Sequence, residues 1–287
     1  MDRISRRAGA VARELESRRS LDSSSANAGT TSAGRPLACA CVLAVSLLAP
    51  CGVLAAHPLV TDDAGTLGRG KLQMELASEV GSHRQGQGSV ELKESMGEVA
   101  AVLSLGLLEN VDLVLGAPWA WSRTSQGGAV VSDEKGFGEA TVELKWRFFE
   151  REGFSLALKP GLTFCGGDTA FGAAFIATQV VGPFSFHANA AYTRNEFQLQ
   201  ADREASRSDI WHGSIAIAAE VLKGLQVVAN VGAETNGDRG SGTWPAFALG
   251  GVVYALTENL DLDLGVKRGL NSAEPELTAM AGMAWRF

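Results

Sequence analysis

Cysteine is scarce in this chain of 287 residues, and its placement excludes two kinds of covalent framework. Three of the four cysteines, Cys39, Cys41 and Cys51, lie in an apolar stretch near the N-terminus, which leaves Cys165 alone in the remainder. A single cysteine forms neither an internal disulfide nor a cysteine-rich metal site. We therefore expect no disulfide scaffold, no metal site and no other cofactor.

Long hydrophobic runs are missing after residue 56, where no segment reaches the roughly 18 apolar residues that a membrane helix needs. A β-barrel passes this filter, because its apolar residues alternate with polar ones. Positive charge is also scarce there, with 18 Lys and Arg against 28 Asp and Glu, a net charge of −10. Nucleic-acid binding calls for a basic surface, so we expect no nucleic-acid partner.

Catalytic motifs are missing as well: the chain has no phosphate-binding glycine loop in the right context, no zinc-ligand spacing and no nucleophile elbow. The best enzymatic alternative is a barrel lipase, which needs Ser, His and a polar orienting group together on its outer surface. The strand pattern described below instead puts Ser185, His187, His212 and Ser214 on the inner face. We expect a protein that is not an enzyme, in which His187 and Asn189 form a hydrated pair.

The N-terminal region is typical of an export signal. Residues 1–36 are rich in Ser and Arg, and residues 37–56 form an apolar stretch that Pro50 and Gly52 interrupt and small residues close. This pattern predicts a signal peptide with an extended N-region over 1–56, and the alternative is a single N-terminal membrane anchor.

Residues 57–70 (HPLVTDDAGTLGRG) have no hydrophobic period. We expect them to form a periplasmic N-terminal segment or a small plug in a barrel mouth. His57, Asp62 and Asp63 are metal-ligand types, but their spacing fixes no geometry, so we interpret them as polar loop residues.

From residue 71 onward, apolar and polar residues alternate with the period of two that is typical of β-strands. In the closing segment 275–287, for example, Met283, Trp285 and Phe287 share one face, and Ala284 and Arg286 lie on the other. Short turns alternate with longer loops, the layout of outer-membrane barrels. The loops are expected at 81–93, 124–136, 166–171, 195–208, 237–243 and 269–275. The twelve predicted strands are 71–80, 95–107, 111–121, 140–148, 154–164, 172–182, 184–193, 211–221, 225–236, 244–256, 260–267 and 275–287.

A soluble β-sandwich also shows alternation, so strand length and aromatic placement decide between the two folds. Many runs reach 10–13 residues, which matches the ~9–11 of a tilted membrane strand better than the ~5–6 of soluble sheets. Aromatic residues gather near strand ends, as in interfacial girdles. The prediction is an all-β, transmembrane, antiparallel up-and-down barrel over 71–287, in contact with lipid of the Gram-negative outer membrane.

Several stretches resemble a family of outer-membrane transporters known as "MetA-pathway of phenol degradation". They include LLENVDLVLGAPW, FGEATVELKWRFFE and LTENLDLDLGVKRGLN with the closing AWRF, and the resemblance spans residues 57–287. It implies a channel for hydrophobic and aromatic compounds and contributes no defined site residues. The ending on Phe287 resembles the last strand of outer-membrane barrels, which implies recognition by the barrel-assembly machinery.

Charged and polar side chains on the inner faces are the candidate functional residues. They would set an electric field across the lumen, while the structural alternative is that they only solvate or lock it. The functional hypothesis is passive uptake of small solutes, aromatic or hydrophobic ones among them. The alternative is a structural barrel, or one whose loops 124–136 and 195–208 bind partners without transport. The lumen-lining candidates are Glu143, Lys145, Arg147, Lys159, His187, Glu220, Glu234, Asp261, Asp263, Lys267 and Arg286.

Overall fold

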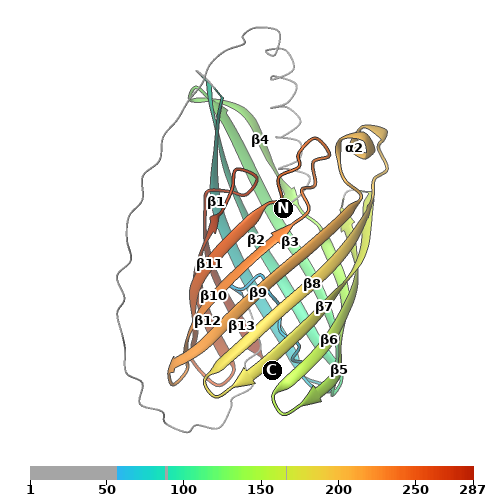
Figure 1. Ribbon diagram of the computed structural model, residues 1–287, viewed down its shortest axis with the longest axis vertical. Helices are drawn as coiled ribbons and strands as arrows, with labels where there is room; N and C mark the ends of the chain where they lie inside the picture. The colour runs from blue at the N-terminus through green and yellow to red at the C-terminus, as the bar shows by residue number, and fades with distance from the viewer. Residues whose placement is uncertain (1–56, 88–89, 166) are drawn as a thin grey trace.

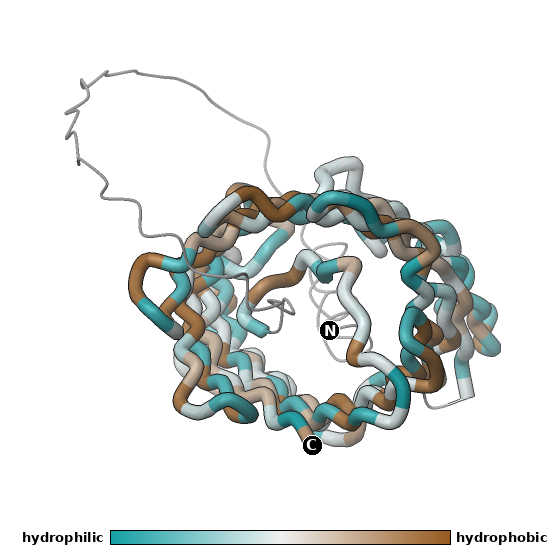
Figure 2. The backbone as a smooth tube through the Cα atoms, turned by 90° about the horizontal axis from the view of Figure 1, so that it is seen from below, coloured by the Kyte–Doolittle hydropathy of each residue, from teal (hydrophilic) through white to brown (hydrophobic). Residues whose placement is uncertain are grey.

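The computed structural model describes residues 57–87, 90–165 and 167–287, and the signal peptide expected at 1–56 lies outside these residues. The described chain forms one antiparallel sheet that closes on itself, seen from the side in Figure 1 and from below in Figure 2. No helix in the described ranges is long and apolar enough to cross a membrane.

The strands follow one another with short connections, and a six-residue helix lies between β8 and β9. The elements in order are β1 (Leu72–Gln87), β2 (Val90–Leu108), β3 (Val111–Gln126), β4 (Ala129–Phe137), β5 (Ala140–Arg151), β6 (Phe154–Cys165), β7 (Asp168–Val181), β8 (Phe184–Glu196), α2 (Gln200–Ala205), β9 (Asp209–Leu222), β10 (Leu225–Glu234), β11 (Ala246–Ala255), β12 (Leu260–Gly269) and β13 (Leu277–Arg286).

The barrel closes where its first strand pairs with its last. β1 and β13 are antiparallel, in a register that runs from Gln73 opposite Arg286 to Ser82 opposite Leu277. Beyond this register, the backbone N–H of Phe287 donates to the carbonyl of Leu72 over 2.8 Å. Closure leaves no open sheet edge within this part of the wall, which a lipid environment requires.

One strand of the barrel is interrupted. β3 pairs with β4 along its upper part, from Trp119 opposite Phe137, and with β5 along its lower part, from Val111 opposite Trp146. Residues 138–139 separate β4 from β5. The two therefore act as one wall element, and the sheet of 13 strands forms a barrel of twelve, which confirms the predicted fold.

Three of the predicted long loops are wrong. Residues 168–171 of the expected loop 166–171 belong to β7. Residues 81–93 belong largely to β1 and β2, which stay paired up to Gln87 opposite Val90, and residues 124–136 belong largely to the hairpin of β3 and β4. Their polar composition predicts loops only if a strand must have an apolar face. Backbone pairing has no such requirement where both faces meet water.

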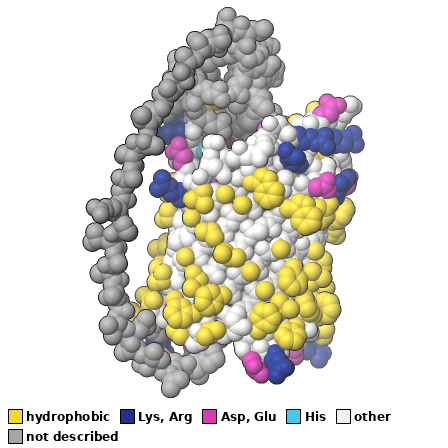
Figure 3. Space-filling view, in the orientation of Figure 1, with side chains coloured by type: hydrophobic (Ala, Val, Ile, Leu, Met, Phe, Trp, Pro, Cys, Tyr) yellow, Lys and Arg dark blue, Asp and Glu magenta, His cyan; other side chains and the backbone are white. Residues whose placement is uncertain are grey.

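The distribution of side chains is the reverse of that in a soluble protein. On β5, Leu144, Trp146 and Phe148 point outward and are exposed, whereas Lys145 between them keeps only 8% of its surface exposed. The same alternation around the barrel produces an outer apolar band, with charges gathered above and below it (Figure 3). We call the end of the barrel that carries the short turns the turn end. Aromatic pairs such as Trp285 and Phe287, with ring centroids 4.6 Å apart, lie near the turn end of this band. The band is the lipid-facing surface of a transmembrane barrel.

Candidate functional site

Residues 57–70, the inner segment, lie inside the barrel (Figure 2). Along its length, the segment contacts strands that are widely separated around the wall. His57 Nδ1 is 2.6 Å from Asp263 Oδ1 on β12, the backbone N–H of Leu67 donates to Asp112 on β3 over 2.9 Å, and that of Gly70 donates to the carbonyl of Gly106 on β2 over 2.7 Å. The inner segment therefore follows the lumen wall and narrows the lumen.

The wall has small residues where the inner segment begins. A Cβ on Gly265 would lie 2.7 Å from Cβ of Pro58, and one on Gly251 would lie 2.9 Å from its Cγ. A Cβ on Gly282 would lie 2.7 Å from Nδ1 of His57. Because these positions on β11, β12 and β13 are glycines, the inner segment can pack directly against the backbone of the wall. A side chain at these positions would prevent so close an approach.

Side chains of the wall replace the strand partner that the inner segment lacks. Asn230 Oδ1 accepts hydrogen bonds from the backbone N–H groups of Val60 (2.8 Å) and Thr61 (3.1 Å), and its Nδ2 donates to Thr61 Oγ1 over 2.7 Å. Thr178 Oγ1 accepts from the N–H of Ala64 over 2.9 Å. A buried N–H group without a partner is costly, so these bonds fix the path of the segment.

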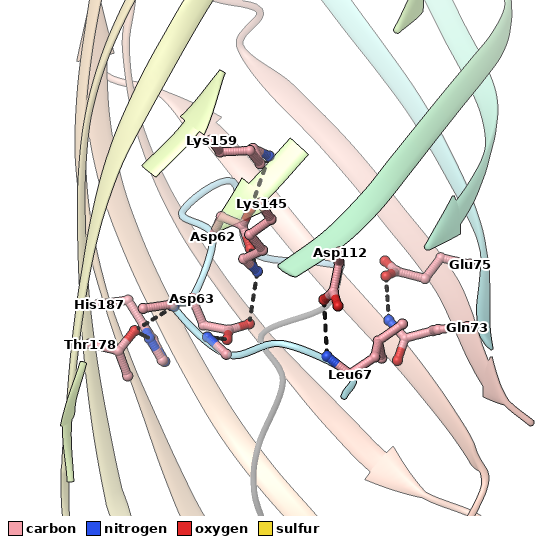
Figure 4. A network of polar contacts seen from close by, with 12 residues as sticks. Asp62, Asp63, Leu67, Gln73, Glu75, Asp112, Lys145, Lys159, Thr178 and His187 are labelled. Carbon is pink, nitrogen blue, oxygen red and sulfur yellow. Dashed lines mark hydrogen bonds and ion pairs between the residues drawn. The ribbon is translucent and has the colours of Figure 1, made fainter. Parts of the chain in front are cut away.

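An ion cluster joins the inner segment to β5 and β6 (Figure 4). Asp62 lies 2.8 Å from Nζ of Lys145 and 2.9 Å from Nζ of Lys159, and Lys159 also lies 3.4 Å from Glu143. The structure thus brings together three of the predicted lumen residues, Glu143, Lys145 and Lys159. Asp62, a residue that the sequence indicates only as part of a polar loop, bridges the two lysines.

The neighbouring carboxyl groups of Asp62 and Asp63 differ in acidity. Burial raises the pKa of Asp62, but the ammonium groups of Lys145 and Lys159 outweigh burial and hold that pKa well below its ordinary value. Asp63 lies 3.9 Å from Nζ of Lys145. For Asp63, burial prevails over that ammonium group and the pKa is raised, with the charge of Asp62 adding to the shift.

The lumen-lining candidates of the last two strands, Asp261, Asp263, Lys267 and Arg286, do not form one cluster. These four residues take separate partners: Arg286 binds Asp261 at 2.6 Å, Lys267 binds Glu274 at 3.1 Å, and Asp263 binds His57. Asp261 and Arg286 meet near one end of β12 and β13, where Asp261 stands opposite Ala284, whereas Lys267 lies farther along and stands opposite Thr278.

The remaining candidates are also placed apart from one another. His187 Nδ1 lies 3.0 Å from Thr178 Oγ1, beside the inner segment. Arg147 pairs with Glu150 at 3.3 Å near the turn end, where Glu220 accepts from the N–H of Gly224. Glu234 lies 3.7 Å from Nδ1 of His212, at the opposite end of β10.

Sequence reasoning missed the polar residues that hold the inner segment and several inner carboxylates. Asn230 and Thr178 sit on inner faces, but uncharged residues were not chosen as candidates. Glu79 and Glu98 lie in predicted strands but were not among the lumen-lining candidates, and Glu94 lies just before the predicted strand 95–107. Extending the alternation of that strand by one residue towards the N-terminus would have placed Glu94 on the inner face.

Comparison with known proteins places the chain among outer-membrane barrels. A family model described as "Putative MetA-pathway of phenol degradation" matches residues 61–287. No curated protein matches the chain in a sequence search.

Solved structures share its fold at low sequence identity. An outer membrane channel from Pseudomonas putida F1 is 12% identical with a TM-score of 0.60, and the match covers 78% of this chain and 98% of that one. The NanC porin is 11% identical with a TM-score of 0.53, over 75% and 98%. The KdgM porin in complex with disordered oligogalacturonate is 9% identical with a TM-score of 0.53, over 75% and 99%. At these identities the likeness shows the fold.

Proposed function

This chain belongs to the MetA-pathway of phenol degradation family, and from that premise we propose that it is an outer-membrane channel for small solutes. Its solutes are proposed to be aromatic or hydrophobic compounds, which enter by passive diffusion. The solute class is supported by the family's description, and the channel by the geometry of the wall.

The observation that carries the proposal is the reversal of the two faces. An apolar band covers the outside, while charged and hydrogen-bonding side chains line the inside of a closed wall. A barrel that served only as an anchor would need the outer band alone. A polar lumen instead offers hydrated solutes a path across the membrane, which the inner segment narrows.

The proposal includes no catalytic role. The solved structures with this fold described above are a channel and two porins. His187 faces the lumen and contacts Thr178, and Ser185 and Ser214 are buried on inner faces. None of these groups lies on the outer surface, where a barrel lipase would meet its lipid substrate.

Export and assembly complete the proposal. We infer that residues 1–56 direct export and that the barrel-assembly machinery recognises the closing strand through Phe287. Phe287 lies at the end of β13, where its backbone bonds to Leu72 continue the closing seam and its ring contacts Trp285.

Two measurements test the proposed function. The purified barrel, reconstituted in planar bilayers, should give discrete conductance steps in potassium chloride. In liposome swelling, phenyl glucoside should enter faster than methyl glucoside, although it is larger. Protein-free liposomes and heat-unfolded barrel serve as controls. A silent, folded barrel would contradict the channel and favour the structural or partner-binding alternative, whereas faster entry of methyl glucoside would contradict only the solute class.

A further inference from the structure

Carboxylates gather on the inner faces of β1, β2 and β4. Glu75 and Glu79 lie on the inner face of β1, where Leu76 and Val80 point outward with 37% and 53% of their surface exposed. In the register of β1 and β2, Glu79 stands directly opposite Glu98. Glu94 lies on the same inner face of β2, two residues before Met96. The hairpin continues the row, because Glu134 on β4 stands opposite Ser122 of β3. We call Glu75, Glu79, Glu94 and Glu134 the acidic stripe.

On the described inner faces of β1 to β4, which carry the acidic stripe, the register places no Lys or Arg. The inner bases lie elsewhere, and Lys145, Lys159, Lys267 and Arg286 each contact a carboxylate outside the stripe. The lumen therefore keeps an excess of negative charge on the side of β1 and β2.

Uncharged polar groups hold two residues of the stripe. Ser122 Oγ donates to Glu94 over 2.8 Å, and Gln73 Nε2 donates to Glu75 over 2.6 Å. Both fix a carboxylate without neutralising its charge.

A buried histidine is the second observation at the stripe. His83 stands directly opposite Glu94 on the same inner face, and only 7% of its surface is exposed. Among the described residues, its Nδ1 has no hydrogen-bond partner. A buried ring nitrogen without a partner, beside a carboxylate, is a polar group that a solute with hydrogen-bonding capacity can satisfy.

We propose that the acidic stripe is a recognition surface that makes the lumen prefer positively charged solutes, with small organic ammonium ions as the favoured class and organic anions disfavoured. This inference rests on the proposed channel and adds the charge of its solutes. Rings or rows of acidic side chains raise the local concentration of cations and repel anions. An ammonium group passing the stripe would meet Glu79 and Glu94 at neighbouring heights, with the His83 nitrogen beside them.

The test compares two permanently charged aromatic ions of similar size, benzyltrimethylammonium and benzenesulfonate. Neither crosses lipid readily, so reversal potentials in planar bilayers report their permeability ratio through the protein. The cation should be favoured in the unmodified barrel. Glu79→Gln and Glu94→Gln should each lower the ratio about threefold, the effect of removing one unit charge within about 6 Å of a hydrated ion.

Asp133→Asn is the matched control. Asp133 precedes Glu134 on β4 but faces outward, where it pairs with Arg123 at 2.6 Å, so its loss should leave the ratio unchanged. Heat-modifiable gel migration checks that each variant folds. A ratio near one or in favour of the anion, or an unchanged ratio in the variant that combines Glu79→Gln and Glu94→Gln, would overturn the acidic stripe and leave the channel intact. Absence of any conductance in the unmodified barrel would overturn the channel and this inference together.

Discussion

The two sides of the lumen use charge differently. Around β5 and β6, Lys145 and Lys159 bind Asp62, so charges of both signs are used to fix the inner segment. Along the described inner faces of β1 and β2, carboxylates lie among polar and apolar residues, without Lys or Arg. The first arrangement is balanced and local, and the second is unbalanced and extends along the wall.

The difference separates stability from selectivity. A balanced cluster contributes to the folded state and has little field beyond its own members. An unbalanced row contributes nothing favourable to folding but acts on any ion that passes. Substitutions on the β5 and β6 side should therefore change stability and lumen width, whereas substitutions on the β1 and β2 side should change ion preference.

The largest stability effect is expected from Asp62→Asn. The change removes the charge that Lys145 and Lys159 share, and breaking a buried ion pair costs about 3–5 kcal/mol. Because 23% of the Asp62 side chain is exposed, we expect the lower end, about 3 kcal/mol, in the free energy of unfolding by urea. Asp133→Asn, in an exposed pair, should cost at most about 1 kcal/mol. Equal losses of unfolding free energy in the two variants would contradict the distinction between the buried ion cluster and the exposed surface pair.

A smaller effect on folding but a clear one on permeation is expected from Gly265→Val. The new side chain would overlap Pro58, which should displace the start of the inner segment and break the contact of His57 with Asp263. Single-channel conductance should rise while the barrel stays folded. Gly250→Val is the matched control, since a Cβ at Gly250, on the outer face of the neighbouring β11, would have no atom within 4 Å. The same conductance in both variants would show that the inner segment does not narrow the path.

The smallest and most gradual effect is expected from acid. The pKa of Asp62 is lower in the folded barrel than in the unfolded chain, so its stabilising contribution is complete above the unfolded pKa of about 4. That contribution is lost only as pH falls below this value towards the lower folded pKa. The difference in urea midpoint between the unmodified barrel and Asp62→Asn should thus be constant from pH 7 to pH 5 and shrink in stronger acid. A difference that vanished already near pH 6 would assign the effect to another group.

The alternation of apolar and polar residues was enough to predict the part of the barrel wall that faces lipid. Segments such as 140–148 and 260–267 carry apolar and charged residues in strict turn, and β5 and β12 contain them. The closing seam followed as well, because a closed barrel pairs its first strand with its last, and an even number of strands makes that pairing antiparallel. Contact with lipid requires apolar residues on the outer face, so the alternation can be recognised in the sequence wherever the wall lies in the membrane.

The features that the sequence did not predict lie where side chains do not face lipid, namely in the upper parts of β1 to β4 and inside the lumen. The upper parts of β1 to β4 are polar on both faces, so they carry no periodic signal although their backbones pair. The path of the inner segment depends on single side chains such as Asn230 and Thr178, which come from distant strands. Such meetings follow from the closed three-dimensional wall and have no trace in local composition.

The inner segment also has a consequence for the order in which the chain folds. Its bond from His57 to Asp263 joins residues 206 positions apart, and the bond from Ala64 to Thr178 joins residues 114 apart. Contacts over such separations form only after the intervening chain has been placed, because loop closure opposes them until then. The closing seam has a similar separation, since Gln73 and Arg286 are 213 positions apart, so the seat of the inner segment and the closure of the wall both wait for the last strands.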